Sequence, residues 1–334
     1  MLPAIFSLSG PELTANERAL FRHAEPAGYI LFARNCADRR QLRALTDELR
    51  ALAGRDDLPI LMDQEGGRVA RLKPPQWPAF PAAEAFDRLY QVAPISAIEA
   101  ARANAAAMAA VLSEVGINVD CTPLLDLRHP QAHEIVGDRA LGGEPMQVAA
   151  LGRAVIEGLA AGGAVGVVKH MPGHGRAITD SHAELPVVTA SREELEADFA
   201  PFRALHWAPM GMTAHVLYTA VDADRCGTLS PLVIEEVIRG EIGFDGLLMT
   251  DDLGMSALAG AAEERARAAL EAGCDLALHC SGDFGEMEAI ASTLGSISEA
   301  ARARLDRAMA TVAGARGTDY EEMTAKRDAL LAHA

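Results

Sequence analysis

The sequence predicts an α/β protein and, within that class, a single-domain (β/α)8 barrel of the TIM type. Eight short apolar runs with the composition of strands alternate with longer Ala- and Leu-rich segments with the composition of helices. Nearly continuous apolar strands indicate a parallel sheet covered on both faces, and eight βα alternations favour a closed barrel over an open doubly wound sheet. No Gly-x-Gly-x-x-Gly motif follows the first strand, which weakens the dinucleotide-binding alternative.

The predicted strands are short apolar runs bounded by polar, glycine or proline residues, as is typical of buried strands. In chain order they are residues 4–10, 28–33, 58–64, 117–126, 164–170, 211–217, 246–252 and 274–280. The helical segments between them include residues 39–52, 95–115, 146–161 and 257–272. After Cys280 the composition is helical, so we expect one domain over residues 1–334, with C-terminal helices from about residue 283. A barrel domain of 334 residues is common.

Composition narrows the function classes. A net charge of −17 argues against nucleic acid and anionic membranes as partners, and no apolar run approaches the ~20 residues that span a bilayer. The first residues lack the basic region and cleavage site of a signal peptide. The five cysteines are odd in number and without C-x-x-C spacing, which indicates reduced thiols. We therefore expect a cytoplasmic protein, a monomer or weak homodimer, with no nucleic-acid or membrane partner.

Polar and titratable residues gather where the predicted strands end. In TIM barrels the catalytic groups lie at the carboxyl ends of the strands, because the βα loops there form the pocket. The opposite ends carry few such groups, and this asymmetry favours an enzyme. The strand-end residues are Asp63, then Asp120 and Asp126, then Lys169 and His170, then His215, then Thr250, Asp251 and Asp252, and finally His279.

Lys169 and His170 end the fifth predicted strand and begin a polar loop with several histidines. A lysine buried there needs a partner, because burying an unpaired charge is costly. A substrate hydroxyl or the carboxylate of Asp63 would supply one; the alternative for this pair of residues is a salt bridge and a core histidine. Arg71 and Arg139 are candidate donors to a sugar or carbonyl through their planar guanidinium groups.

Two acids, Asp251 and Asp252, directly follow the seventh strand. A carboxylate there can be a nucleophile, a metal ligand or a helix N-cap, and we expect the capping role for Asp252.

Asp180 and His182 are two residues apart, so in an extended loop their side chains point the same way. An aspartate beside an imidazole makes the histidine a usable acid and base. Spacing alone favours a solvated loop, but the position just after the Lys-His strand end favours catalysis.

A metal site is the alternative interpretation of the histidines. His170, His174, His182, His215 and His279 could be grouped as ligands. No His-x-His follows the first strand and no His-Glu-x-x-His occurs, so a metal-dependent barrel hydrolase is the weaker hypothesis. The sequence therefore predicts no metal and no cofactor.

These motifs resemble those of family 3 glycoside hydrolases of the bacterial β-N-acetylglucosaminidase type. The resemblance runs from Gly28 to about Cys280, and its motifs are highly specific only in combination. Relatives usually carry Phe where this chain has Met171 and Ser where it has Thr250, which are mild departures. The motifs are Asp-Gln-Glu-Gly-Gly-Arg-Val at 63–69, Lys-His-Met-Pro-Gly-His-Gly at 169–175, Asp-Ser-His at 180–182 and Asp-Asp-Leu at 251–253.

The resemblance implies a role for each candidate residue. Asp251 would be the nucleophile, His182 the general acid/base and Asp180 its dyad partner. Sugar contacts would come from Asp63, Arg71, Arg139, Lys169 and His170. The implied reaction is retaining hydrolysis that removes terminal β-linked GlcNAc. Gly173 and Gly175 suggest hinge-like freedom, so we expect the His182 loop to close over the sugar.

The resemblance also implies a substrate and a pathway. The expected substrate is a small soluble amino sugar, a muropeptide (GlcNAc–anhydro-MurNAc) or GlcNAc glycoside, cleaved in peptidoglycan recycling. Aromatic residues are only 4% of the chain, which agrees with a substrate gripped at one sugar subsite instead of along a polysaccharide. A β-glucosidase of the same family is the nearest alternative.

Overall fold

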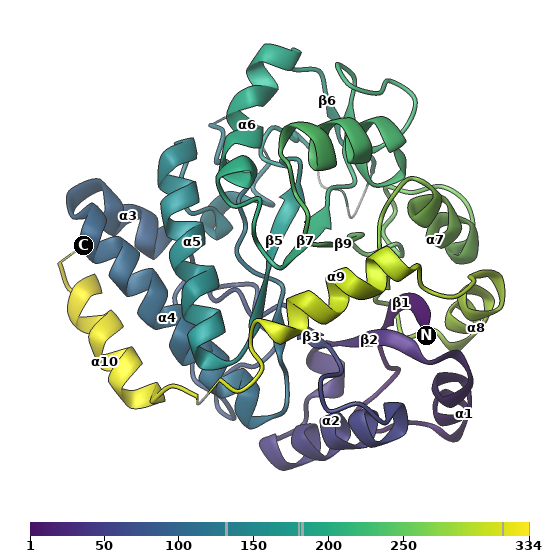
Figure 1. Cartoon of the computed structure of the whole chain (residues 1–334). Helices are drawn as coiled ribbons and strands as arrows, with labels where there is room; N and C mark the ends of the chain where they lie inside the picture. Colours follow the sequence, from purple (N-terminus) through teal and green to yellow (C-terminus); the bar gives the residue numbers. More distant parts are fainter. Residues whose placement is uncertain (131–132, 180, 182–183, 316, 334) are drawn as a thin grey trace.

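Eight parallel strands form a barrel with helices around it in the computed structural model, which describes residues 1–334 except 131–132, 180, 182–183, 316 and 334 (Figure 1). The sheet order is β10-β1-β2-β3-β4-β5-β7-β9. A bridge between Met249 and Leu276 joins β9 to the start of β10 and closes the ring. The predicted TIM-type barrel is therefore confirmed. Its strands are β1 Leu2–Phe6, β2 Pro26–Leu31, β3 Ile60–Met62, β4 Val119–Asp120, β5 Val165–Met171, β7 Met210–Thr213, β9 Leu247–Met249 and β10 Ala277–His279.

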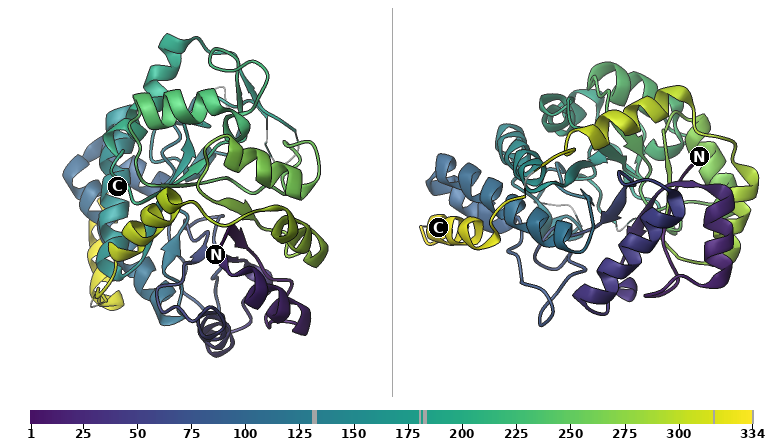
Figure 2. Two further views of the ribbon diagram at one scale, coloured as in Figure 1. Left: turned by 45° about the vertical axis from the view of Figure 1, so that its right-hand side comes forward. Right: turned by 60° about the horizontal axis from the view of Figure 1, so that its bottom comes forward.

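Helices cover the outer face of the barrel (Figures 1 and 2). Side-chain caps define several of their starts: Asp38 accepts a hydrogen bond from the backbone N–H of Gln41, and Ser191 forms a capping box with Glu194. The helices are α1 Ala15–Ala24, α2 Arg39–Ala53, α3 Glu84–Val92, α4 Pro94–Glu114, α5 Pro145–Gly162, α6 Arg192–Ala204, the π-helix η4 Leu232–Glu241, α7 Ala262–Glu271, α8 Phe284–Thr293, α9 Glu299–Ala310 and α10 Tyr320–Leu331, with 3₁₀ turns η1 Ala33–Asn35, η2 Gly137–Arg139 and η3 Gly227–Leu229.

Some predicted boundaries were wrong. Helix α7 begins at Ala262 and not at residue 257, because turns occupy the segment between β9 and the helix. Asp252 does not cap it; Asp252 Oδ1 instead accepts a hydrogen bond from Gly254 N at 2.9 Å within the turn. A second sheet, unpredicted, pairs β6 Val187–Val188 with β8 Leu217–Tyr218 in parallel.

The barrel interior is a dry apolar core, closed at its amino-terminal end by α9. Leu305, Ala308 and Met309 of α9 are buried in the same cluster as the inward-facing strand residues. Figure 1 shows this helix crossing the barrel end after the chain leaves α8. The functional groups are consequently confined to the other end. The strand residues of the cluster are Ile5, Ala27, Ile30, Leu61, Val119, Cys121, Val165, Val167, Met210, Met212, Leu247, Met249, Leu276 and Leu278.

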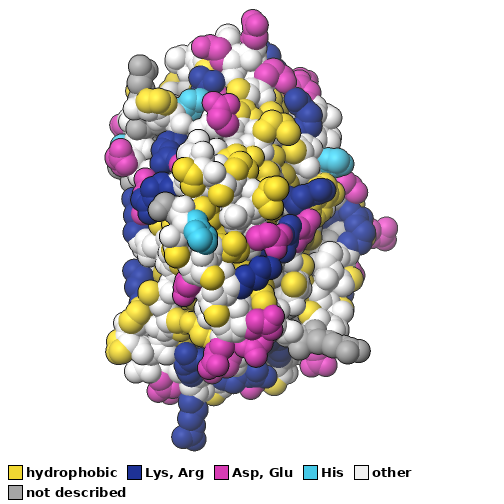
Figure 3. All heavy atoms as spheres, turned by 90° about the vertical axis from the view of Figure 1, so that its left-hand side faces the viewer, with side chains coloured by type: hydrophobic (Ala, Val, Ile, Leu, Met, Phe, Trp, Pro, Cys, Tyr) yellow, Lys and Arg dark blue, Asp and Glu magenta, His cyan; other side chains and the backbone are white. Residues whose placement is uncertain are grey.

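Helix α4 is long and apolar enough to cross a membrane by length and composition alone, and 67% of its most apolar window is buried inside the protein. It packs against α3, α5 and α10. Figure 3 shows the side of the molecule where these helices lie, with apolar patches interrupted by acidic and basic side chains. Most of its apolar side chains are therefore used in packing.

Candidate active site

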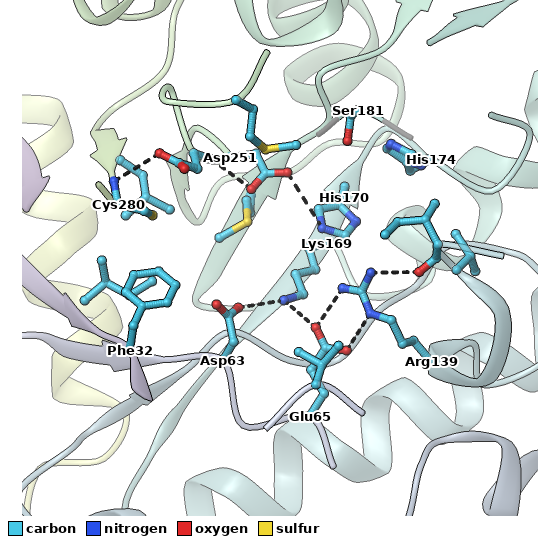
Figure 4. Close-up of a pocket in the computed structure, with 18 of the residues that line it drawn as sticks. Phe32, Asp63, Glu65, Arg139, Lys169, His170, His174, Ser181, Asp251 and Cys280 are labelled. Atoms are coloured by element: carbon cyan, nitrogen blue, oxygen red, sulfur yellow. Dashed lines mark hydrogen bonds and ion pairs between the residues drawn. The ribbon is translucent and has the colours of Figure 1, made fainter. Parts of the chain in front are cut away.

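A cavity of about 260 Å³ opens at the carboxyl ends of the strands, where sequence placed the candidate residues. Its walls include Asp63 after β3, Lys169 and His170 of β5, and Asp251 after β9, together with Phe32 after β2 (Figure 4). Arg71 and Arg139 also line it. The structure thus brings together six of the eight predicted site residues.

A chain of alternating charges forms one wall of the cavity. Lys169 Nζ lies 3.1 Å from Asp63 Oδ1 and 2.8 Å from Glu65 Oε1. Arg71 Nη2 binds the other oxygen of Asp63 at 2.9 Å. Arg139 holds Glu65 with two hydrogen bonds of 2.8 Å, from Nε and Nη2 (Figure 4). Of the two partners that the sequence suggested for a buried Lys169, a substrate hydroxyl or the carboxylate of Asp63, the structure contains the pair with Asp63.

Pairing shifts the pKa values of Lys169, Asp63 and Glu65 in favour of their charged forms. Burial opposes the charge of Lys169, but Glu65 and Asp63 outweigh it and raise the pKa of the ammonium. Burial would likewise raise the pKa of Asp63, and the charges of Lys169 and Arg71 lower it instead. The pKa of Glu65 is lowered for the same reason by Lys169 and Arg139. These side chains present fixed donors and acceptors, which is what recognition of sugar hydroxyls requires.

His170 is fixed by Asp126. Its Nδ1 lies 2.7 Å from Asp126 Oδ2, while Asp126 Oδ1 accepts the backbone N–H groups of His170 and His174 at 3.1 and 2.7 Å. Burial favours the neutral acid, but His170 and the N–H donors prevail and lower the pKa of Asp126 to about 2. Because a carboxylate can only accept, the His170 Nδ1 carries hydrogen. The other nitrogen, Nε2, is 3.9 Å from Asp251 Oδ2.

Asp251 presents a charged carboxylate to the cavity. Its Oδ1 accepts the backbone N–H of Asp252 at 2.8 Å. Burial would raise its pKa, yet the nearby His170 ring, this hydrogen bond and the charge of Lys169 are among the causes that lower it below the ordinary value. A carboxylate that is ionised at neutral pH and held on a strand end is suited to nucleophilic attack.

Glu65 and Asp126 were not predicted as site residues. Glu65 lies in the motif that begins at Asp63, two residues after it, and that position is the signal that could have indicated its role. Asp126 was noted only as a polar residue after a strand. Asp120 has a different environment: it is fully buried, and its Oδ1 accepts the backbone N–H of Gln64 at 3.0 Å. Its Oδ2 has no hydrogen-bond partner among the described residues, and burial raises its pKa.

The predicted acid/base pair, Asp180 and His182, lies outside the described residues. Ser181, between them in the sequence, is buried and lines the cavity. The glycines upstream lie in closely packed backbone, and the expected closure of the His182 loop stays a prediction. A side chain at Gly173 would press on Asp198, and one at Gly175 would collide with the carbonyl oxygen of Leu127. These glycines permit close backbone packing.

Metal ligation by the histidines has no geometric support in the part of the chain that is described. Among residues 1–334 without the seven omitted positions, no three His, Cys, Asp or Glu side chains are placed to share a metal ion. His215 and His279 are buried and hydrogen-bonded to other groups: His215 to Thr228 and Asp252, and His279 to Ser281.

Comparison with known proteins identifies the family of this chain. Residues 5–315 match the glycosyl hydrolase family 3 N-terminal domain. The chain is 37% identical to a β-hexosaminidase of Pseudomonas aeruginosa over 98% of this chain and 96% of the relative. It is 42% identical to a β-hexosaminidase of Alkalilimnicola ehrlichii over 83% of this chain and 80% of the relative. NagZ from Neisseria gonorrhoeae, crystallised with N-trifluoroacetyl-D-glucosamine, superposes with a TM-score of 0.87 at 32% identity, covering 99% of this chain and 98% of NagZ. The chain therefore belongs to glycoside hydrolase family 3, among the β-hexosaminidases of the NagZ type.

Proposed function

We propose that this protein is a retaining exo-β-N-acetylglucosaminidase that removes terminal β-linked GlcNAc from muropeptides such as GlcNAc–anhydro-MurNAc in peptidoglycan recycling. The observation that carries the proposal is the cavity itself. It holds an ionised Asp251 beside a wall of fixed hydrogen-bonding charges. The binding of N-trifluoroacetyl-D-glucosamine by the Neisseria NagZ supports an amino sugar as the unit recognised.

The size and charge of the cavity support a single-sugar subsite. Its volume of about 260 Å³ lies just below the ~300–1,000 Å³ range of small-molecule sites, as suits one monosaccharide better than an oligosaccharide. Asp63, Lys169 and Arg139 offer acceptors and donors along one side (Figure 4). Such a wall can bind the hydroxyls of a terminal sugar, and this arrangement favours removal of chain-end residues.

The mechanism has two displacements. In the first, an oxygen of Asp251 forms a bond to the anomeric carbon while the bond from that carbon to the leaving oxygen breaks, and His182 gives its proton to that oxygen. In the second, His182 takes a proton from water and the water oxygen bonds to the anomeric carbon. The bond between that carbon and the Asp251 oxygen breaks at the same time, which frees the carboxylate and the sugar. His170, held by Asp126, lies beside the nucleophile and orients the sugar.

The acid/base assignment to Asp180 and His182 is part of the proposal. It is supported by their sequence motif and by the position of Ser181 in the cavity wall. Most glycosidases use two carboxylic acids, one of which is the acid/base. In this proposal Asp251 is the nucleophile, and the imidazole of His182 takes the place of the second carboxylic acid. Asp180 would hold the imidazole in its proton-donating tautomer.

We also place the protein in the cytoplasm. All five cysteines are free, with Cys121, Cys226 and Cys274 buried, which supports a reducing compartment. A cytoplasmic muropeptide hydrolase would act on soluble fragments.

The test is an assay of aryl β-GlcNAc against aryl β-glucoside with the wild type, Asp251→Ala and His182→Ala. We expect turnover of the GlcNAc substrate, release of the β-anomer first by NMR, and near-complete loss of activity in Asp251→Ala. The loss in His182→Ala should be larger for poor leaving groups than for activated ones. Full activity of Asp251→Ala would refute the mechanism.

The same assay separates the alternatives. A preference for the aryl glucoside would indicate a β-glucosidase of the same family. Loss of activity with a chelator, restored by added metal, would indicate a metal-dependent hydrolase. Cleavage of GlcNAc–anhydro-MurNAc with free GlcNAc as product tests the muropeptide assignment directly.

A further inference from the structure

A buried histidine outside the cavity wall connects to the proposed nucleophile through the backbone. His215 follows β7, and its side chain is fully buried. Its Nε2 lies 2.9 Å from the carbonyl oxygen of Asp252, and its Nδ1 lies 2.7 Å from the hydroxyl of Thr228. The ring therefore bridges the turn at η3 and the loop that carries Asp251.

The hydrogens of this bridge can be assigned from chemistry. The carbonyl oxygen of Asp252 can only accept, so His215 Nε2 carries hydrogen. Burial lowers the pKa of His215, which favours the neutral ring, and in a neutral ring with hydrogen on Nε2 the other nitrogen, Nδ1, is an acceptor. The Thr228 hydroxyl consequently donates to Nδ1, at 2.7 Å in preference to the carbonyl of Ala214 at 3.2 Å, and accepts from the Thr213 hydroxyl at 2.8 Å. The result is a directed chain from Thr213 to Asp252.

The end of this chain is the residue that fixes the nucleophile. Asp252 N donates to Asp251 Oδ1 at 2.8 Å. The side chain of Asp252 accepts from Cys280 N at 3.0 Å and from Gly254 N at 2.9 Å. The carbonyl of Asp252 accepts from His215 Nε2 at 2.9 Å and from Met255 N at 3.1 Å, so its backbone N–H, side chain and carbonyl all have partners. His215 is the side chain that ties this residue to another strand end, and Asp252 N in turn holds the Asp251 carboxylate.

We propose that His215 is a positioning residue for the reaction: by donating to the Asp252 carbonyl it holds Asp252 in place, and the N–H of Asp252, in the preceding peptide unit, orients the Asp251 carboxylate toward the anomeric carbon. This inference rests on the proposed nucleophilic role of Asp251. A nucleophile must lie about 3–3.5 Å from the carbon it attacks, and a displacement of about 1 Å can cost about 100-fold in rate. His215 acts through Asp252 and does not touch the substrate.

Two substitutions separate the two hydrogen bonds of the ring. Asparagine places its carbonyl oxygen near the position of Nδ1 and can accept from Thr228, but it is too short to reach Asp252. Glutamine extends an amide nitrogen toward the position of Nε2 and can donate to the Asp252 carbonyl. His215→Asn thus removes the contact that the inference requires, and His215→Gln keeps it.

We expect His215→Asn to lower kcat/KM for aryl β-GlcNAc by about 10- to 100-fold, with the Kd of free GlcNAc changed less than about threefold. His215→Gln should recover most of the loss. His279→Asn is a matched control, since His279 is also a buried histidine at a strand end, that of β10, and is bonded to Ser281 instead of the nucleophile loop. Its kcat/KM should stay within about threefold. Thermal unfolding of all variants shows which remain folded at the assay temperature.

The outcomes are decisive in each direction. Near-wild-type kcat/KM in His215→Asn overturns the proposal, and so do equal losses in the Asn and Gln variants, because those would reflect packing alone. A Kd for GlcNAc that rises in step with the loss of kcat/KM also overturns it. Full activity of Asp251→Ala would instead overturn the proposed mechanism, whatever His215 does.

Discussion

Glu65 is the carboxylate on which the charged wall depends, and its replacement by glutamine tests that description. The side chain is only 6% exposed and contacts both Lys169 and Arg139. Glutamine keeps the volume but removes the charge, and its NH₂ group would face a cation. Lys169 would retain Asp63, while Arg139 would retain, among its contacts with described residues, the carbonyl of Ile135 at 3.0 Å.

The size of the effect follows from burial. Two cations with charge centres about 4 Å away each attract the carboxylate by about 4 kcal/mol at an effective dielectric constant of about 20. Burial of the carboxylate offsets several kcal/mol of this attraction, and loss of one partner of a buried pair typically costs about 3–5 kcal/mol. At about 2 °C per kcal/mol in a chain of this size, Glu65→Gln should lower Tm by about 6–10 °C.

Denaturant unfolding measures this loss, and pH gives a second signature. The folded-state pKa of Glu65 is lower than its ordinary value of 4.5, so its stabilisation is complete above that value and is lost as pH falls through the lowered one. The gap between wild type and Glu65→Gln should therefore be constant from neutral pH to about pH 5 and narrow below it.

Glu84→Gln is the matched control. Glu84 also contacts two arginines, Arg88 at 3.1 Å and Arg128 at 3.4 Å, but it is 39% exposed. Exposed pairs are worth about 0–1 kcal/mol, so this variant should lose no more than that. If Glu65→Gln is destabilised no more than Glu84→Gln, the account of the wall as a buried, mutually dependent unit is refuted.

Three further expectations follow from the site and its supports. Asp126→Asn should lower kcat/KM by about tenfold or more and lower the free energy of unfolding by about 1–3 kcal/mol, because the charged partner of the His170 ring is lost. Steady-state kinetics measures the first effect and urea unfolding the second, and unchanged values would contradict the expectation. Gly175→Ala should cost about 1–3 kcal/mol by overpacking against a neighbouring carbonyl oxygen, whereas Gly10→Ala, with nothing within 4 Å, should be nearly neutral. The pKa of Asp251 is below its ordinary value of 3.8, so the acid limb of kcat/KM should fall below that pH; a limb near pH 5 or above would show that the carboxylate is not held ionised.

The barrel was predictable because its strands are covered on both faces and so appear as unbroken apolar runs. The residues that pair within each strand were harder to predict. Residues 117–126 were predicted as one strand, but β4 covers only Val119–Asp120. Pro123 has no N–H to donate to a ladder, and pairing with β5 resumes after it as an isolated bridge between Leu124 and Lys169. β6 and β8 are two residues each, too short to show any periodicity.

The site residues were predictable individually, and their partners were not. Glu65 and Arg139 are 74 residues apart, and Asp126 and His170 are 44 apart. No local pattern records such pairings, because they arise when βα loops from different strands meet at one end of the barrel. Charge alone showed that Lys169 needed an acid, and it did not show that there would be two. The roles of Asp180 and His182 stay predictions.

The closure of the barrel by its first and last strands has a consequence for synthesis on the ribosome. Ala4 of β1 pairs with Ala277 of β10, and α9 then seals the interior with Leu305 and Met309. Contacts so distant in sequence cannot form until nearly the whole chain has emerged. Until then β1 is an unpaired edge with an apolar face, which makes the nascent chain a client for chaperones. The pocket, formed by loops from every part of the barrel, can be completed only as a late event of folding.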